Sequence, residues 1–483
     1  MAKKRTKPRT AVAYAATAFV QLSTVVAFLS CMLAAQGAVL RAELKPAVLD
    51  DPRSPPLGAE APVLRAPEGP LATAASTRLH ALTKDLCSEA EKGKLAFRSA
   101  PGKTPAVLAP TKSQVVTIPD GANTVKVLLY CKNQMWYASS ASMLKGTAGK
   151  ETLEFLDADL DGDFFSPKDF MRHGGNAFRP VDDHRLMLLQ DSIGQYEIDT
   201  SQRAPRLAIK PLPWPAWTDA TQRLGTCLVA ECRQLGGLSP FWLDENRSSL
   251  CRAHANYLDQ NKFTFETSVL QTHAEEPDRP GYTKAGADAA TKVVISFTGD
   301  MTEAVTGQIW SMFHRAAFLG PPDDGMGIAM KVGSLAGIPG YTVFWGNRAS
   351  IPADGMPICF PAAGSRGSAT FCAREAPGVK DDPNFYNTQR GLDVSVTYGK
   401  LPLSNIKLEL FLEAKGGLRS VPGRQFSHER PVNADFDPKN SSTAFFVADQ
   451  MLKTATWYMA AFRADLADSK VPFELVWWFE TQQ

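Results

Sequence analysis

A thirty-residue stretch without a single charge, close to the N-terminus, is the feature that most limits what this chain can be. It runs from Ala11 to Leu40 and follows a segment with five lysines and arginines in the first ten positions. About 20 apolar residues are enough to cross a bilayer, and a basic flank marks the cytoplasmic side. Residues 1–40 therefore form either a cleaved secretory signal, with a small-residue site near Ala35-Gln36-Gly37, or an uncleaved membrane anchor. Both predict an extracytoplasmic body and the membrane as a partner of the N-terminal segment.

The rest of the chain carries little net charge. Lysine and arginine number 52 and aspartate and glutamate 50, so 47 basic and 50 acidic residues remain after the first ten positions. A near-neutral body lacks the basic surface that binds nucleic acid, which excludes that class of partner. With 44% hydrophobic and 21% charged residues among 483, we expect about three folded domains.

Eight cysteines are compatible with disulfides in an exported protein. Signal cleavage would remove Cys31 and leave seven, an odd number. The spacing of the cysteines does not assign partners, so the pairing stays open.

Composition divides the body into four parts. Seven prolines between Arg41 and Pro70 predict a proline-rich linker over 41–120, with a short helix from about 77 to 94. Short alternating strands predict a small β domain over 121–211, which contains an aspartate-rich turn. Helical periodicity and an Asp300–Glu303 cap predict an α/β domain over 212–348. Alternating strands return over 349–483 and favour a β-sandwich. The expected fold class is thus an α+β multidomain chain.

Four aspartates and one glycine within seven residues form the sharpest local motif. They are Asp157, Asp159, Asp161, Gly162 and Asp163. Oxygen ligands at the first, third and fifth positions, with glycine at the sixth, are the first half of a calcium-binding loop. The twelfth position, which normally supplies a bidentate acid, is Lys168, and Asp169 comes one residue late. A weak calcium site and a solvated acidic turn both fit this pattern.

Three of the seven histidines, His254, His273 and His314, lie in the α/β part. Histidine is a frequent metal ligand and general base, so the group is a candidate site. His254 shares an apolar helical stripe with Leu250 and Leu258, which favours a packed residue, whereas the other two lie at segment edges. The sequence has no P-loop, HExxH, CxxC, Gly-x-Ser-x-Gly or Rossmann glycine pattern, which removes the common nucleotide and protease interpretations.

The order of several motifs in the α/β part resembles the CAP superfamily of cysteine-rich secretory, antigen-five and pathogenesis-related proteins. The motifs are Gly236–Pro240, Leu250–Leu258, Thr272-His273, Gly281–Gly286, Ala304–Trp310, Phe313-His314-Arg315 and Gly325–Ala329. The match covers about 216–346 and is most similar to the bacterial branch. In addition, the closing Trp477–Thr481 resembles the last strands of bacterial immunoglobulin-like domains.

The resemblance implies a secreted α-β-α sandwich with a cleft that holds zinc in some members. His273 and His314 match the two cleft histidines. The acidic positions of the family do not match, and Glu275, Glu276 or Asp288 would have to replace them. Two histidines without carboxylates make a poor catalytic zinc site, since such sites need three protein ligands and a base.

Three functions follow as hypotheses. The first is a non-catalytic, exported or membrane-tethered module that binds a lipid, a wall component or a protein. The second is a metal-dependent hydrolase that uses zinc at His273 and His314. The third is an adhesin stabilised by calcium at the aspartate motif.

Overall fold

The computed structural model describes residues 39–483 with internal gaps. The gaps are 58, 64–72, 91–93, 100–102, 121–122, 133–134, 183, 203, 265–266, 268, 321–324, 335–338, 347–356, 375–377, 399–402, 416, 433–442 and 467–471. The signal or anchor expected over 1–40 therefore lies outside the described residues, except for its last two positions. Within the described part, no helix combines the length and the apolar composition that a bilayer crossing needs.

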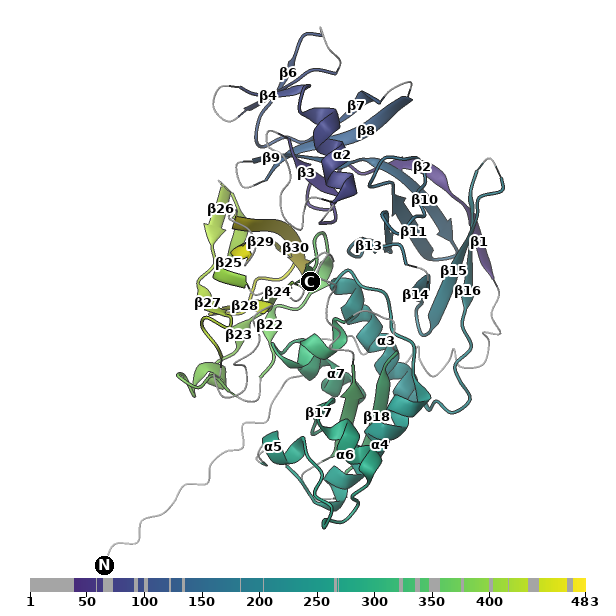
Figure 1. Cartoon of the computed structure of the whole chain (residues 1–483), viewed down its shortest axis with the longest axis vertical. Helices are drawn as coiled ribbons and strands as arrows, with labels where there is room; N and C mark the ends of the chain where they lie inside the picture. Colours follow the sequence, from purple (N-terminus) through teal and green to yellow (C-terminus); the bar gives the residue numbers. More distant parts are fainter. Residues whose placement is uncertain are drawn as a thin grey trace, which may run out of the picture. The chain divides into compact units, whose positions relative to one another are not determined.

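Antiparallel β-sheet dominates the chain (Figure 1). Strands account for 42% of the residues and helices for 18%. The expected α+β class, with a CAP-like α-β-α sandwich between a small β domain and an immunoglobulin-like sandwich, is therefore wrong. The sequence interpretation underestimated strands because many are only two to four residues long, too short for alternation to be visible.

The N-terminal part contains four sheets and one helix. Their orders are β1-β16-β15-β14, β13-β12-β11-β10-β2, β3-β9-β8-β7 and β4-β5-β6. The elements are β1 (Leu40–Glu43), β2 (Lys45–Val48), β3 (Glu60–Pro62), α2 (Ala74–Thr83), β4 (Cys87–Ala90), β5 (Lys94–Phe97), β6 (Ala106–Leu108), β7 (Gln114–Asp120), β8 (Asn123–Lys132), β9 (Met135–Ser140), β10 (Ser142–Ala148), β11 (Glu151–Leu156), β12 (Phe170–His173), β13 (Arg179–Pro180), β14 (Leu186–Leu188), β15 (Ile193–Asp199) and β16 (Arg206–Pro211).

The segment 41–120, which its prolines predict as a linker, contributes strands to all four of these sheets. Pro46 lies in β2, Pro62 in β3 and Pro119 in β7, and each of these strands is at the edge of its sheet. Proline lacks an N–H, so an edge strand, which needs no partner on one side, accommodates it. The prolines here mark sheet edges and not an extended connection. The expected helix is α2, which ends at Thr83 and is followed by β4.

Helices are concentrated between residues 220 and 345. The elements are α3 (Ala220–Leu235), α4 (Glu245–Gln260), α5 (Val269–Thr272), α6 (Lys284–Ala290), β17 (Val294–Ser296), α7 (Met301–Ile309), η3 (His314–Phe318), β18 (Gly327–Val332) and β19 (Gly340–Trp345). The strands form a sheet of order β17-β19-β18, and α4 packs on β18 and β19. Asp300 accepts a hydrogen bond from the backbone N–H of Glu303 and so caps α7, as the sequence predicts.

The C-terminal part contains a four-stranded, a five-stranded and a two-stranded sheet, ordered β20-β24-β28-β27, β21-β30-β29-β25-β26 and β22-β23. The elements are β20 (Ile358–Phe360), β21 (Arg366–Ser368), β22 (Phe371–Cys372), η5 (Phe385–Asn387), β23 (Arg390–Gly391), β24 (Asp393–Thr397), β25 (Leu403–Ala414), β26 (Gly417–Ser420), β27 (Gly423–Phe426), β28 (Thr443–Ala448), β29 (Trp457–Leu466) and β30 (Pro472–Thr481). The two larger sheets pack together through β25 and β28.

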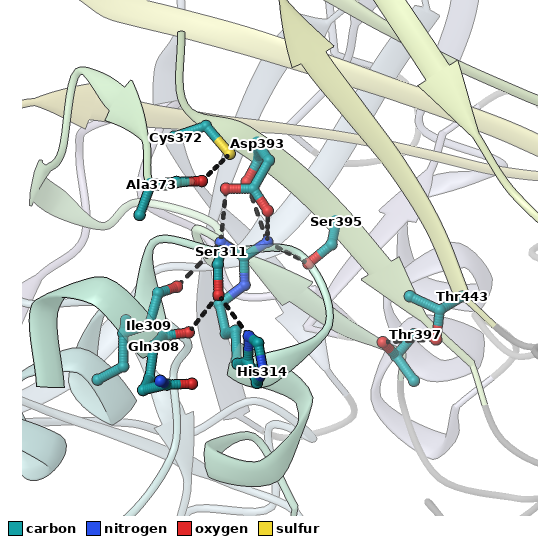
Figure 2. A network of polar contacts seen from close by, with 11 residues as sticks. Gln308, Ile309, Ser311, His314, Cys372, Ala373, Asp393, Ser395, Thr397 and Thr443 are labelled. Carbon is teal, nitrogen blue, oxygen red and sulfur yellow. Dashed lines mark hydrogen bonds and ion pairs between the residues drawn. The ribbon is translucent and has the colours of Figure 1, made fainter. Parts of the chain in front are cut away.

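A buried ion pair joins the helical part to the C-terminal sheets. The guanidinium of Arg315, in η3, donates to both carboxylate oxygens of Asp393 in β24, at 3.1 and 2.7 Å. The same guanidinium donates to the hydroxyl of Ser395, and both charged side chains are at most 1% exposed. Figure 2 shows this network beside Ser311, whose hydroxyl donates to the Gln308 carbonyl and lies 3.3 Å from His314 Nδ1. Because the charges are paired and hydrogen-bonded, this network fixes η3 against β24.

None of the seven described cysteines forms a disulfide with another. Burial raises the pKa of the Cys87 thiol to about 12, and likewise that of Cys227 to about 12. Such thiols stay protonated at neutral pH and react slowly. The described part of the fold therefore depends on packing and not on cross-links.

Candidate metal centre

The aspartate loop, Asp157–Asp169, connects β11 to β12. These strands are antiparallel, and Leu156 at the end of β11 pairs with Phe170 at the start of β12. The next residue outward on each side is an aspartate, so Asp157 and Asp169 face each other at the base of the loop. The loop then turns sharply at Gly162, whose φ of 89° is a conformation that glycine adopts without strain.

Three carboxylates meet at this base. Ligand oxygens of Asp157, Asp159 and Asp169, the aspartate triad, all lie within 4.8 Å of one another. Oxygens bound to one calcium ion at about 2.3–2.6 Å can be up to about 5 Å apart, so the triad is compact enough to share an ion. Carboxylate oxygens are hard donors that suit calcium, magnesium or manganese rather than zinc or copper.

Backbone N–H groups hold two of the three carboxylates in place. Asp157 accepts hydrogen bonds from the backbone of Asp161 and Gly162, each at 3.1 Å. Asp169 accepts from the backbone of Ala158 at 2.9 Å and from both the backbone and the hydroxyl of Ser166. These contacts orient the carboxylates toward one another although they carry like charges.

Asp159 differs from the other two members of the triad. It is 6% exposed, and its Oδ1 is a buried oxygen without a hydrogen-bond partner among the described residues. Its Oδ2 lies 3.4 Å from Nζ of Lys168, an exposed lysine. A buried carboxylate oxygen that lacks a partner costs folding free energy, so its position beside two more carboxylates makes the triad a candidate cation site.

Burial and mutual repulsion raise the pKa of two members of the triad, Asp157 and Asp169. Burial raises the pKa of Asp157 to about 7, and the neighbouring Asp169 adds to this increase. Burial also raises the pKa of Asp169 to about 6, against the opposing effect of its hydrogen bonds from Ser166 and Ala158. A divalent ion would reverse this preference because it favours the charged carboxylates.

A pH dependence of stability follows for the cation-free protein. The folded-state pKa values of Asp157 and Asp169 exceed their ordinary value of 3.8. Their contribution to stability is therefore complete below about pH 4 and is lost as the pH rises through 6 and 7. In EDTA, we expect the melting temperature to fall more steeply between pH 5 and 8 for the wild type than for Asp157→Asn, as thermal melts followed by circular dichroism would show. Equal slopes for both proteins would contradict the prediction.

The triad overlaps only in part with the ligands expected from the sequence. Asp157 and Asp159 belong to it, whereas Asp161 and Asp163 accept hydrogen bonds from the backbone of Asp163 and Phe165 within the turn. Asp169 takes their place. Sequence spacing missed it because it is one position late for a calcium loop of the EF-hand type, but the pairing of β11 with β12 would have revealed it.

The two histidines expected to bind zinc make other contacts. His273 follows α5, and its Nδ1 donates to the carbonyl of Ala290 at 2.9 Å. His314 opens η3 beside Ser311. Among the described residues, the aspartate triad is the only group of three or more histidines, cysteines or acids with ligand atoms in reach of one ion. The structure thus brings no carboxylate to these histidines in a three-ligand arrangement.

The acids expected to support those histidines are also engaged elsewhere or exposed. Glu275 is buried, and its Oε1 lies 2.9 Å from Nδ1 of the fully buried His254, whose Nε2 donates to the carbonyl of Thr272. Glu276 pairs with Arg279 at the surface, and Asp288 is exposed on α6. The His254–Glu275 pair fixes the loop after α5, and it engages the carboxylate of Glu275.

No family model, curated protein or solved structure matches the chain. The resemblance of residues 216–346 to the CAP superfamily therefore stays a prediction from motif order. Among the described residues, the aspartate triad is the group whose chemistry, hard oxygen donors gathered at one point, is most specific to a ligand class.

Proposed function

We propose that this chain is an exported, non-catalytic binding protein whose fold is stabilised by one calcium ion held by the aspartate triad. Asp159 carries the proposal: its Oδ1 is a buried oxygen without a partner among the described residues, and one of its carboxylate oxygens lies within 4.8 Å of a carboxylate oxygen of Asp157 and of Asp169. A calcium ion would supply the missing partner and neutralise the repulsion between the three side chains.

The low calcium affinity that we expect for the triad supports an extracytoplasmic location of the protein. The triad lacks the bidentate acid of high-affinity loops, because the twelfth position is Lys168. Sites of this kind in extracellular modules have dissociation constants of about 10⁻⁴ to 10⁻³ M, which suits millimolar calcium outside the cell. The apolar stretch 11–40, as a signal or anchor, would deliver the body to that environment.

The proposal that the protein is non-catalytic rests on the chemical character of the triad. The triad is acceptor-only when ionised and is buried, so it suits a structural ion better than a reacting substrate. The bound partner in this proposal is a lipid, a wall component or another protein. The hydrolase hypothesis finds no support in the contacts of His273 and His314 described above.

Calorimetric titration of the full chain, stripped with EDTA and dialysed, tests the proposal. We expect one calcium ion per chain, with a dissociation constant of about 0.1–1 mM, and weaker binding of magnesium, whose octahedral shell at about 2.0–2.1 Å fits a pre-formed carboxylate site less easily. A zinc titration of the wild type, His273→Ala and His314→Ala runs in parallel. Absence of calcium binding up to 10 mM would refute the proposal, and zinc binding that both histidine variants abolish would favour the hydrolase instead.

A further inference from the structure

The aspartate loop contacts three separate hydrophobic cores. Leu160, 4% exposed, belongs to the α2 core, which also contains Leu79 of α2 and Ile118 of β7. Ala158 belongs to a second core, around Leu128 of β8. A single loop thus inserts into cores built from different sheets.

A third core receives the other end of the loop. Phe164 and Phe165 pack against the cluster that includes Phe155 of β11 and Tyr196 of β15. The rings of Phe165 and Phe155 are in edge-to-face contact, with centroids 5.2 Å apart. The loop therefore contributes side chains to the α2 core at Leu160 and to this third core at Phe164 and Phe165.

Polar contacts connect the triad directly to α2. Arg78 of α2 donates from one guanidinium nitrogen to the backbone carbonyl of Asp159, at 2.9 Å. Its second nitrogen donates to the carboxylate of Asp120 at the end of β7, at 2.7 Å. Arg78 thus links the helix to the backbone of Asp159, the member of the triad whose buried Oδ1 lacks a partner among the described residues.

The backbone next to Asp159 is strained. Leu160 has a φ of 61°, in the left-handed region that an ordinary L-residue rarely adopts. This conformation directs its side chain into the α2 core. Contacts between a cation and Asp159 would help to maintain it, and repulsion between three bare carboxylates would oppose it.

We infer that calcium at the aspartate triad acts as a latch: by ordering the loop, the ion keeps α2 packed against β3 and β9, through Leu160 and Arg78. This inference rests on the proposed function, because it needs the ion to bind. With the ion bound, the loop is rigid, Leu160 stays in the α2 core and α2 is protected. Without it, the loop loosens, and α2 with its core opens locally while the other parts remain folded. The site would thus make the order of residues 74–83 depend on external calcium.

Hydrogen–deuterium exchange of the full chain, with 10 mM calcium or with EDTA, tests the latch. We expect calcium to slow exchange at least tenfold both in the loop, 157–169, and in α2, 74–83. In Arg78→Met and in Leu160→Ala, calcium should still slow exchange in the loop but no longer in α2. Because coupling is reciprocal, both variants should also bind calcium several-fold more weakly.

Arg424→Met is the matched control. Arg424 is 35% exposed and pairs with Asp381, as Arg78 is 38% exposed and pairs with Asp120, but it lies in β27. This variant should behave as the wild type. If calcium binds and protects the loop while exchange in α2 is unchanged, the latch is wrong and the proposed function stands. If calcium does not bind, the latch and the proposed function are both wrong. If calcium still slows exchange in α2 of Arg78→Met and of Leu160→Ala, the coupling does not run through these two residues.

Discussion

Replacing Asp393 with alanine is expected to destabilise the folded chain by about 3–5 kcal/mol, because it leaves the guanidinium of Arg315 buried without a counter-charge. Arg315 is 1% exposed, and Asp393 accepts two hydrogen bonds from it. Urea unfolding followed by tryptophan fluorescence would show the change as a lower urea concentration at the midpoint. The relevant transition is the one in which the helical and C-terminal parts unfold.

An exposed ion pair provides the control for this experiment. In β25, Nζ of Lys407 lies 2.8 Å from Oε2 of Glu409, and both side chains are exposed. Glu409→Ala should change stability by less than about 1 kcal/mol, as is usual for surface pairs. A second comparison is the double variant Arg315→Met with Asp393→Leu, which removes both charges and should recover much of the loss. An Asp393→Ala protein as stable as Glu409→Ala would show that the pair is not buried in solution.

Asp159→Asn is expected to remove about half or more of the stabilisation by calcium. For a wild-type site saturated to 100 times its dissociation constant, binding contributes about 2.7 kcal/mol. Asparagine removes one charged ligand but no backbone hydrogen bond, because the described backbone N–H groups bind Asp157 and Asp169 instead. We expect the calcium affinity to fall at least tenfold, as calorimetry would show.

The sign of the stability change in EDTA distinguishes a lost ligand from a folding defect. Without a cation, Asp159→Asn removes a like charge from a buried cluster, so the variant should be at least as stable as the wild type. With 10 mM calcium the order should reverse. Asp161→Asn and Asp163→Asn change the same charge in the same loop but outside the triad, and both should keep calcium binding within a few-fold. Loss of binding in these two variants, with retention in Asp159→Asn, would restore the ligand set of an EF-hand loop.

Local structure could be predicted where a strand or helix is long. The stretch 124–131 reads as a strand and is β8, and the cap at Asp300 marks the start of α7. The class of the whole chain could not be predicted, because the prolines of 41–120 suit edge strands as well as linkers. Which of the two they form depends on partners such as β9 and β10, far along the chain.

For the candidate metal site, too, the sequence predicts some residues and not others. The spacing of Asp157 and Asp159 indicates a cation, and both belong to the triad. Asp169 could not be assigned from spacing, because its place depends on the pairing of Leu156 with Phe170. Glu275 is expected beside the cleft histidines, but its partner is the buried His254 of α4. Nothing in the local sequence around Glu275 indicates this contact.

The pairing of β1 with β16 also has a consequence for how the chain is made. Leu40 pairs with Ile209, so β1 has no partner in its sheet until about 160 further residues have been synthesised. At about 5–20 residues per second this takes roughly 8–30 s. During that interval the emerging polypeptide exposes an open strand edge, the state that chaperones recognise and that aggregates most readily. The sheet that contains β1 is thus completed only after most of the N-terminal part has been synthesised.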